Sequence, residues 1–384
     1  MKIQSYIKNS NIMNIKYLFI IMSIMMIGCD NGGKKSRDKE TGKEIIVQQI
    51  NTDALINTDS IISDFKVIPL QNTNPPIGNI KKLMFCKGKI IIWDQKGKSI
   101  WVFSEEGNFI SSISSLGRGP KEYTSINNVS ITTPNIINIA DAASKSIIKY
   151  NFEGKFIERF STISYLSDYI EKDGYKYSFY HDIVSEDINK YFLKISDNSG
   201  FRSGFFPFTC TRQFGENYFI KSNEDIYFNK SFDNRIYKIS GDKLMTAYSL
   251  NFGIDTFPCH KLENLKENDN YYKIINSKKF IGNMSNICLT KNFLTFFYEI
   301  RDKKNPIVMF FIYNLRTDKY YNYQYAKTEK YVIATNPKFT DGEYFYDTVE
   351  PWTLSKISRS KLFKKFNVSV TADSNPILLK FKYK

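Results

Sequence analysis

The sequence predicts an all-β fold, a six-bladed β-propeller with small helical insertions, and three observations lead to this prediction. From residue 85 onward, one sequence pattern of apolar strands and polar turns recurs along the chain. Its period is about 45 to 50 residues with about four strands in each copy, which is typical of propeller blades. Two isolated strand-like segments, DFKVIPLQ and NPILLKFKYK, lie at opposite ends of the repeated region. If they share one blade, they close the ring and protect the sheet edges.

The clearest two copies of the repeat are KIIIWDQKGKSIWVFSEEGNFISSIS and NIINIADAASKSIIKYNFEGKFIERFS. Their matched positions are 47 residues apart, as for Asp94 with Asp141 and for Gly107 with Gly154. Each copy has the pattern of an apolar strand, a polar turn, an alternating strand, a glycine turn and a further short strand. The glycines stand where a tight hairpin requires a positive φ.

Weaker copies follow and complete the count of blades. In DIYFNKSFDNRIYKISGDKLMTAYSL, Ile236 aligns with Ile147, which leaves room for one intervening blade containing YFLKISDNSGFRSGFFPF. A further copy is FLTFFYEIRDKKNPIVMFFIYNLRTDKYYNYQY. Five copies of the repeat can thus be recognised, and the two end segments supply the sixth blade. Residues 257–285 and the segment LSKISRSKLFKKF interrupt the pattern with helical spacing, and we expect both to be insertions.

The N-terminal residues predict export and a lipid anchor. Residues 1–28 contain lysines followed by YLFIIMSIMMIG, an apolar run of about 12 residues that is too short for a membrane span and typical of a signal peptide. The ending Met26-Ile27-Gly28-Cys29 resembles the bacterial lipobox, and this resemblance implies lipidation at Cys29. The alternative is an ordinary cleaved signal peptide with an incidental cysteine. Residues 29–43 are polar and predict a flexible tether, and residues 44–384 form the predicted propeller domain.

Composition favours a large folded core and gives no specific partner. Aromatic residues make up 16% of the chain, and the formal net charge is +15. Removal of residues 1–28 takes away three lysines and no acid, which leaves +12. A basic surface can meet anionic lipid or acidic glycans, but export argues against nucleic acid. The lysines are scattered and not clustered as a binding footprint requires, so an AT-rich coding bias explains them equally well.

The chain resembles the six-bladed β-propeller lipoproteins of Bacteroidota, which are similar to NHL-repeat propellers. The resemblance rests on DFKVIPLQ, on the first two blades, on LGRGPKEY and on the terminal DSNPILLKFKYK. It implies a propeller in the cell envelope, held at the outer membrane and facing the periplasm or the cell surface. Most members of this group have no assigned activity. Their usual motif is GRGPGEY, so Lys121 replaces a glycine here, and we expect this position to reveal any change in the turn.

The sequence predicts no metal site, no cofactor and no catalytic residue. Its two histidines, His181 and His260, lack the spacing of a metal site and stand beside no G-x-S-x-G nucleophile elbow. The cysteines after Cys29 have no C-x-x-C spacing, and we expect buried free thiols, with a disulfide as the alternative. These cysteines are Cys86, Cys210, Cys259 and Cys288.

The loop SSLGRGPKEY lies between the first and second repeats and supplies three candidate binding residues, Arg118, Glu122 and Tyr123. It lacks the G-K-S/T ending and the helix of a P-loop. At the rim of a propeller, Arg118 could hold a carboxylate or sulfate and Tyr123 could stack on a sugar. The alternative is a structural turn in which the glycines and a proline fix the backbone and the charged residues pair locally.

Asp94 and Asp141 are the remaining candidates, because matched positions in neighbouring blades could face a common channel. Two carboxylates there could act on a glycosidic bond. The alternative is that each aspartate caps a turn through backbone hydrogen bonds. Trp93 and Trp101 lie in apolar strands, so we expect them in the core and not in a carbohydrate platform.

These observations predict a monomeric binding or scaffold module of the cell envelope, whose partner is a glycan, a peptide or an envelope protein. A polysaccharide lyase or hydrolase is the alternative, and a purely structural envelope component is a third hypothesis. An enzyme should bring two titratable groups with shifted pKa values from different blades to the channel. A binding protein should show an aromatic pocket or an apolar patch.

Overall fold

The computed structural model describes residues 42–47, 51–132, 134–162, 166–180, 191–207, 218–254, 280–301, 306–331, 333 and 335–384. These residues belong to one compact unit, Thr41–Lys384. The predicted signal peptide, Cys29 and nearly all of the predicted tether lie outside the described residues, so their predictions stay open. The first strand begins at Lys43, one residue before the predicted start of the domain.

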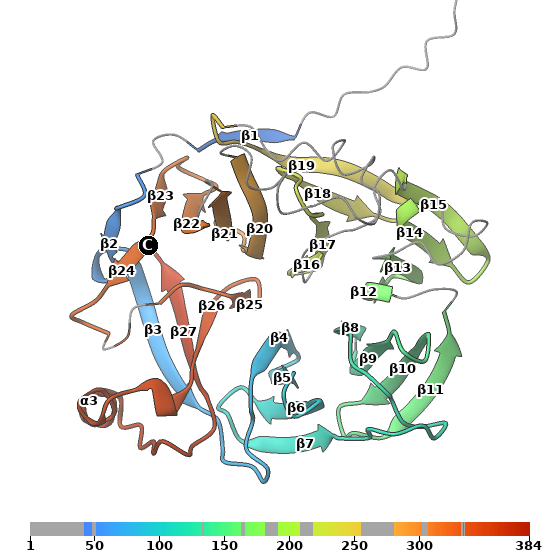
Figure 1. Cartoon of the computed structure of the whole chain (residues 1–384), viewed down its shortest axis with the longest axis horizontal. Coiled ribbons are helices and arrows are strands. Elements are labelled where there is room, and N and C mark those ends of the chain that lie inside the picture. The colour runs from blue at the N-terminus through green and yellow to red at the C-terminus, as the bar shows by residue number, and fades with distance from the viewer. Residues whose placement is uncertain are drawn as a thin grey trace, which may run out of the picture. The chain divides into compact units, whose positions relative to one another are not determined.

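Six sheets, five of four strands and one of five, surround a central axis and form a six-bladed β-propeller, as predicted (Figure 1). The three blades that follow one another from residue 80 each run from an innermost to an outermost strand. Blade 1 contains β4 (Ile80–Cys86), β5 (Lys89–Asp94), β6 (Ser99–Ser104) and β7 (Phe109–Ile113). Blade 2 contains β8 (Asn128–Thr132), β9 (Ile136–Asp141), β10 (Ser146–Asn151) and β11 (Phe156–Ser161). Blade 3 contains β12 (Leu166–Lys172), β13 (Tyr175–Tyr180), β14 (Tyr191–Asp197) and β15 (Gly200–Pro207).

The other three blades follow the same order. Blade 4 contains β16 (Phe219–Ser222), β17 (Asp225–Phe228), β18 (Arg235–Ser240) and β19 (Lys243–Asn251). Blade 5 contains β20 (Phe280–Leu289), β21 (Phe293–Arg301), β22 (Ile307–Asn314) and β23 (Tyr320–Tyr323). Blade 6 contains β25 (Phe339–Thr340), β26 (Phe345–Val349), β27 (Ile377–Tyr383) and β3 (Ile62–Pro69). The weaker repeats in the sequence therefore correspond to blades 3, 4 and 5.

Blade 6 combines strands from both ends of the chain. Strand β27 pairs antiparallel with β3, from Ile377 opposite Pro69 to Phe381 opposite Phe65. This pairing confirms the predicted closure of the ring by DFKVIPLQ and NPILLKFKYK. Because the last blade cannot form until both ends of the chain meet, closure joins the whole domain in one structure.

Sequence pattern and position in the blade agree. The middle strands β5 and β6 are buried along nearly their whole length, because a neighbouring blade packs on each of their faces. Such strands read as continuous runs of β-branched and aromatic residues. The outermost strands β7 and β11 are largely exposed and carry polar residues. The hairpin turns repeat as well, since Gly107 has φ 91° and Gly154 has φ 78°.

The N-terminal segment extends along the outer edges of blades 4 and 5. Strand β1 (Lys43–Ile46) pairs parallel with β19, the outermost strand of blade 4. Strand β2 (Leu55–Asn57) pairs parallel with β24 (Tyr325–Lys327) beside blade 5, and the short helix η1 (Thr58–Ser60) leads into β3. Lys43 Nζ also forms an ion pair with Asp318 at 2.6 Å. These pairings cover strand edges that would otherwise be open.

One predicted helical insertion is confirmed and the other is partly wrong. Helix α3 (Lys356–Phe366) follows the short helix η3 (Pro351–Thr353) between β26 and β27. It begins with a Ser355 side chain that accepts the N–H of Ser358, and it ends at Asn367 in the left-handed conformation. Residues 280–285, which we expected in the other insertion, belong to β20, because Phe280 and Ile281 are buried in the core. The rest of 257–285 lies outside the described residues.

The core lies between the blades and contains Trp93, Trp101 and the described cysteines, as expected. Trp93 and Trp101 are each 4% exposed, which confirms them as core residues. Cys86 and Cys288 are buried free thiols. Burial raises the pKa of Cys288 to about 12, so its reactive thiolate is scarce. Cys210 and Cys259 lie outside the described residues.

Candidate functional site

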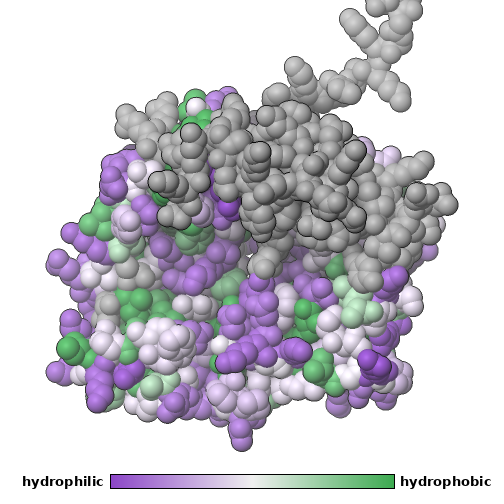
Figure 2. All heavy atoms as spheres, in the orientation of Figure 1, coloured by the Kyte–Doolittle hydropathy of each residue, from purple (hydrophilic) through white to green (hydrophobic). Residues whose placement is uncertain are grey.

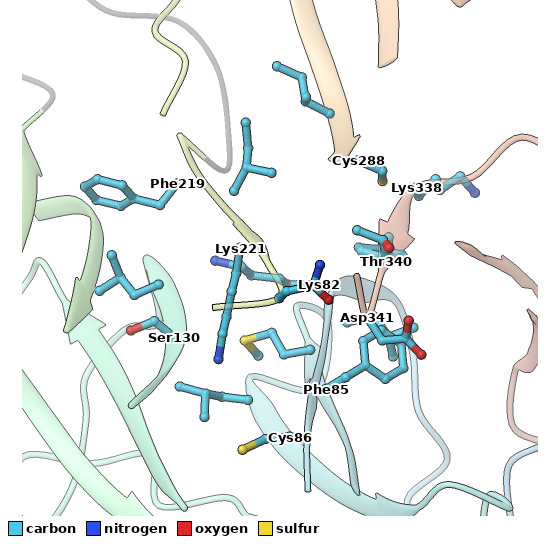
Figure 3. Close-up of a pocket in the computed structure, with 18 of the residues that line it drawn as sticks. Lys82, Phe85, Cys86, Ser130, Phe219, Lys221, Cys288, Lys338, Thr340 and Asp341 are labelled. Carbon is cyan, nitrogen blue, oxygen red and sulfur yellow. The ribbon is translucent and has the colours of Figure 1, made fainter. Parts of the chain in front are cut away.

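The innermost strands of all six blades surround a central cavity of about 470 Å³ (Figure 3). Consecutive inner strands run in the same direction, so their first residues meet at one end of the channel and their hairpin turns meet at the other. Much of the wall is apolar. The apolar residues include Leu83, Met84, Phe85, Ile131, Ile170, Phe219, Ile220, Ile287 and Phe339.

Lys82 on β4 brings a half-buried positive charge into this wall. Its Nζ donates to Asn128 Oδ1 on β8 at 3.2 Å. Burial lowers the pKa of Lys82, and the negative charge of Asp168 opposes this effect. No ion pair links Lys82 to any residue that the structure describes. An ammonium group has three N–H donors, so two donors have no acceptor within this part of the chain.

Asp168 on β12 is the buried acid of the same cavity. Its Oδ1 accepts the backbone N–H of Tyr169 at 2.8 Å, and its Oδ2 accepts the N–H of Phe219 on β16 at 2.9 Å. Burial raises the pKa of Asp168, while Lys82 opposes the rise. The carboxylate therefore connects the inner strands of blades 3 and 4, and both of its oxygens are occupied.

The other charges of the cavity wall divide into paired and free groups. Asp341 accepts N–H groups of its own turn and the hydroxyl of Tyr346 at 2.8 Å. Lys338 forms an ion pair with Asp347 at 3.1 Å. At the hairpin end of the channel, the wall also contains exposed side chains that no described residue pairs, namely Lys87, Lys221 and Glu224. Lys82 differs from them in being half-buried and in donating a hydrogen bond to Asn128.

Asp94 and Asp141, both predicted candidates, lie outside the cavity wall. The carboxylate of Asp94 accepts backbone N–H groups of Gly78, Asn79 and Gly97, each at 3.0 Å. Asp141 accepts hydrogen bonds from six donors, the backbone N–H and the hydroxyl group of each of Thr124, Ser125 and Ser144. Each aspartate fastens its hairpin to the segment before the inner strand, which is the capping arrangement considered from the sequence. Binding by either residue stays a prediction.

The SSLGRGPKEY loop connects β7 to β8, so it is a connection between blades as expected. Tyr123 is fully buried, and its hydroxyl donates to Lys98 O at 2.7 Å and Ile113 O at 3.2 Å. Its ring is therefore enclosed by protein and not presented at the rim. Glu122 accepts the N–H of Gly119 at 2.7 Å, which fixes the turn from inside.

Arg159 on β11 completes this loop from the next blade. Its guanidinium donates to Gly119 O at 3.3 Å and to Glu122 O at 3.0 Å. Arg118 is exposed and has no partner among the residues that the structure describes. The loop brings Arg118, Glu122 and Tyr123 close in sequence but gives them different surroundings. Of the three, Arg118 is the one whose polar group is free at the surface.

Lys121 stands at a position that does not require glycine, because its φ is not positive. Its carbonyl accepts the hydroxyl of Tyr150, and its Nζ lies 6.0 Å from the ring centre of Phe156. Gly117 leaves room for the Glu122 carboxylate, since a Cβ there would overlap Glu122 Oε2 and displace that side chain.

A family model described as "Domain of unknown function (DUF4934)" matches residues 44–382. The chain belongs to this family. Similar solved structures include a Bacteroides fragilis protein to which export is attributed, with a TM-score of 0.73 and 18% identity over 89% of this chain and 100% of that chain. A DUF4221 family member from Bacteroides vulgatus has a TM-score of 0.50 and 11% identity over 84% of this chain and 97% of that one. The comparison with curated proteins gave no match.

These comparisons confirm the fold expected from the resemblance to propellers of Bacteroidota. At such low identity they establish the fold of this DUF4934 chain and carry no residue roles. Within the described ranges, no three His, Cys, Asp or Glu side chains gather as metal ligands. No helix of the described ranges is long and apolar enough to cross a membrane. His181 and His260 lie outside the described residues.

Sequence reasoning missed Lys82 and Asp168. The available signal was one charged residue inside each of two otherwise apolar strands, IKKLMFC and LSDYIEK. Because β4 contains Lys81 and Lys82 side by side, the sequence does not show which lysine turns inward. Figure 2 shows hydrophilic and hydrophobic residues intermingled over the visible face, so a surface view alone gives no such signal.

Proposed function

We propose that this protein is a lipid-anchored binding module of the cell envelope that takes its ligand in the central cavity. The observation that carries the proposal is the cavity of about 470 Å³, bounded by all six blades and containing the unused donors of Lys82. This volume falls in the range of about 300–1,000 Å³ for small-ligand pockets. It fits a small molecule or the terminal unit of a glycan or peptide.

The proposed location rests on the N-terminal sequence. Residues 1–28 have the pattern of a signal peptide, and the lipobox-like ending places an acylated Cys29 before a polar tether. The similar structure from Bacteroides fragilis, to which export is attributed, supports an envelope location. Acyl chains at Cys29 would hold the propeller at the outer membrane.

Anchoring is tested by fractionation of cells that produce the wild-type chain or Cys29→Ala. We expect the wild type in the membrane fraction and the variant in the released fraction, because the variant has no thiol to acylate. Cys288→Ala is the matched control and should remain with the membrane. A Cys29→Ala chain that stays in the membrane fraction would contradict the anchor.

Ligand binding in the cavity is tested by a thermal-shift screen of sugars, sugar acids and short peptides with the full chain in detergent. Any ligand found is then tested on Lys221→Trp, which places a large ring at an exposed position of the cavity wall. We expect this variant to lose binding at least tenfold. Lys361→Trp on α3, exposed and outside the cavity wall, is the control. Equal binding by both variants and the wild type would place the ligand elsewhere.

One observation supports a polysaccharide-acting enzyme as the second candidate. Lys82 and Asp168 come from blades 1 and 3, line the same cavity and have pKa values shifted in opposite directions by burial. Such pairs occur at catalytic sites. Binding remains the better-supported function, because both oxygens of Asp168 accept backbone N–H groups. Release of reducing ends or unsaturated sugars from polysaccharides, lost in Lys82→Met, would favour the enzyme.

A further inference from the structure

We propose that the central cavity selects ligands with an anionic oxygen group, a carboxylate or a sulfate, and that Lys82 binds this group. The inference rests on the proposed binding function and specifies its ligand class. It starts from Lys82, a half-buried cation in the cavity wall whose hydrogen bonds are incomplete. Removing a charged group from water is costly unless it is paired or hydrogen-bonded, so a partly desolvated ammonium group favours a further partner.

Within the described residues, most of the hydrogen-bonding capacity of the Lys82 ammonium group is unused. Among the described residues, one hydrogen bond to Asn128 Oδ1 at 3.2 Å accounts for one of its three donors. An anionic ligand would supply the missing acceptors and a negative charge in direct contact, in addition to the charge of Asp168, which acts on Lys82 without a hydrogen bond. Charge-assisted hydrogen bonds of this kind are stronger than neutral ones.

None of the described acids of the cavity wall forms an ion pair with Lys82 that would take the place of that anion. Asp168 accepts N–H groups of Tyr169 and Phe219 with its two oxygens. Asp341 is held by its own turn and by Tyr346. Glu224 is exposed in the β16–β17 turn, whereas Lys82 lies near the start of β4. These placements leave the Lys82 ammonium group available to a ligand.

The rest of the wall indicates the body of the ligand. Apolar side chains such as Met84, Ile131 and Phe219 surround the space, with Ser130 and Thr340 as the hydroxyl groups (Figure 3). Apolar and aromatic surfaces pack against the C–H faces of a compact ring, while a few polar groups fix its orientation. A single acidic sugar satisfies both requirements, and the two anion types share the same recognition by Lys82.

The proposal also fixes the sign of the pH dependence. Only the ammonium form of Lys82 donates to an anion with a favourable charge, and burial lowers its pKa below the ordinary 10.5. The groups that face it are Asn128, which is neutral, and Asp168, whose negative charge opposes the lowering. Affinity should therefore fall as pH rises, at a lower pH than for an ordinary lysine.

The test compares three probes that differ at one carbon: glucuronate, glucose 6-sulfate and glucose. Calorimetric titration uses the full chain in detergent, as wild type, Lys82→Met and the exposed control Lys361→Met. We expect at least one of the two anionic probes to bind the wild type at least tenfold more tightly than glucose. The anionic probe that binds identifies whether Lys82 recognises a carboxylate or a sulfate. Lys82→Met should lose this preference and Lys361→Met should keep it.

Circular dichroism and thermal unfolding check that Lys82→Met is folded, and Lys82→Gln provides a second neutral variant if it is not. Equal affinity for all three probes, or an anion preference that survives in the folded Lys82 variant, would overturn the inference. If a neutral compound from the screen binds and Lys221→Trp blocks it, the binding function stands while the anionic class fails. If no compound binds the wild type, both proposals fail.

Discussion

Asp141 and Lys82 are charged residues in neighbouring blades, but Asp141 is buried and Lys82 is half-buried in the cavity wall. Asp141 lies at the end of β9 and accepts hydrogen bonds from six donors on Thr124, Ser125 and Ser144. Burial alone would raise the pKa of Asp141, but these hydrogen bonds outweigh it and hold the pKa below 3.8. Lys82 has one hydrogen bond, and burial lowers its pKa toward the neutral form.

The difference separates a structural charge from a candidate binding charge. A buried ion with a complete set of hydrogen bonds stabilises the fold around it. A charged group beside a cavity whose own hydrogen bonds are incomplete has donors left for a ligand. On this comparison, the hydrogen bonds of Asp94 and Asp141 give these residues structural roles, whereas Lys82 on the inner strand β4 is the better binding candidate.

The largest expected effect comes from Asp141→Ala. The change leaves several donors of the β9 hairpin and the preceding loop without an acceptor, so we expect a loss of about 3 kcal/mol in the free energy of unfolding. Urea unfolding measures it. Asp53→Ala, at an exposed aspartate, should change stability by less than about 0.5 kcal/mol. Equal stability of both variants would contradict the structural role of Asp141.

The contribution of Asp141 to the free energy of unfolding should also depend on pH. Because the folded-state pKa of Asp141 is lowered, its contribution is present above its ordinary pKa of 3.8 and is lost as pH falls through the folded-state value. The stability difference between wild type and Asp141→Asn should therefore narrow in acid. Unfolding curves between about pH 3 and 7 test this window. A constant difference would show that the carboxylate charge is unimportant.

Gly117→Ala tests the loop between blades 1 and 2 and should have the next largest effect. Its new Cβ would overlap Glu122 Oε2, so the Glu122 side chain must move and give up its hydrogen bond to Gly119, at a cost of about 1–2 kcal/mol. Glu122→Ala removes the clashing carboxylate together with its bond to Gly119. The double variant should be less destabilised than the sum of the single variants. Simple additivity would contradict the clash.

Lys82→Met should produce a smaller, pH-dependent change in the free energy of unfolding. The unfolded chain keeps its lysine protonated up to about pH 10.5, whereas the folded chain loses this proton at a lower pH. In that window the unfolded state binds more protons, so wild-type stability should rise with pH. The rise should be weaker in Lys82→Met and unchanged in Lys361→Met. Parallel curves for all three proteins would contradict the lowered pKa.

Lys121→Gly should have the smallest effect. Lys121 is exposed with a negative φ, so glycine gains no conformational advantage and adds only unfolded-state freedom, worth a few tenths to about 1 kcal/mol. Thermal unfolding should show a slightly lower midpoint for the variant. A clearly stabilised variant would mean that lysine strains the turn.

Much of the architecture could be predicted because it depends on local pattern. The offset between Asp94 and Asp141 placed these residues at equivalent turns, and the two end segments predicted the closed blade. Segment 280–285 was assigned wrongly, because its mixed polarity resembles a helical insertion and only packing shows that Phe280 is buried. The candidate site was less predictable, since sequence spacing does not reveal which residues from different blades share a cavity.

The sequence by itself determined the repeat, the number of blades and the closure of the ring, because strand periodicity and turn glycines are local features. It also predicts the anchor from the lipobox-like ending. Tertiary structure decided that Tyr123 is buried, that Asp94 and Asp141 cap their own hairpins, and that Lys82 and Asp168 line one cavity. The physical reason is that burial and hydrogen bonding depend on which residues folding brings together. For the aspartates these are the segments before the inner strands, and for Lys82 and Asp168 they are the other blades of the closed ring.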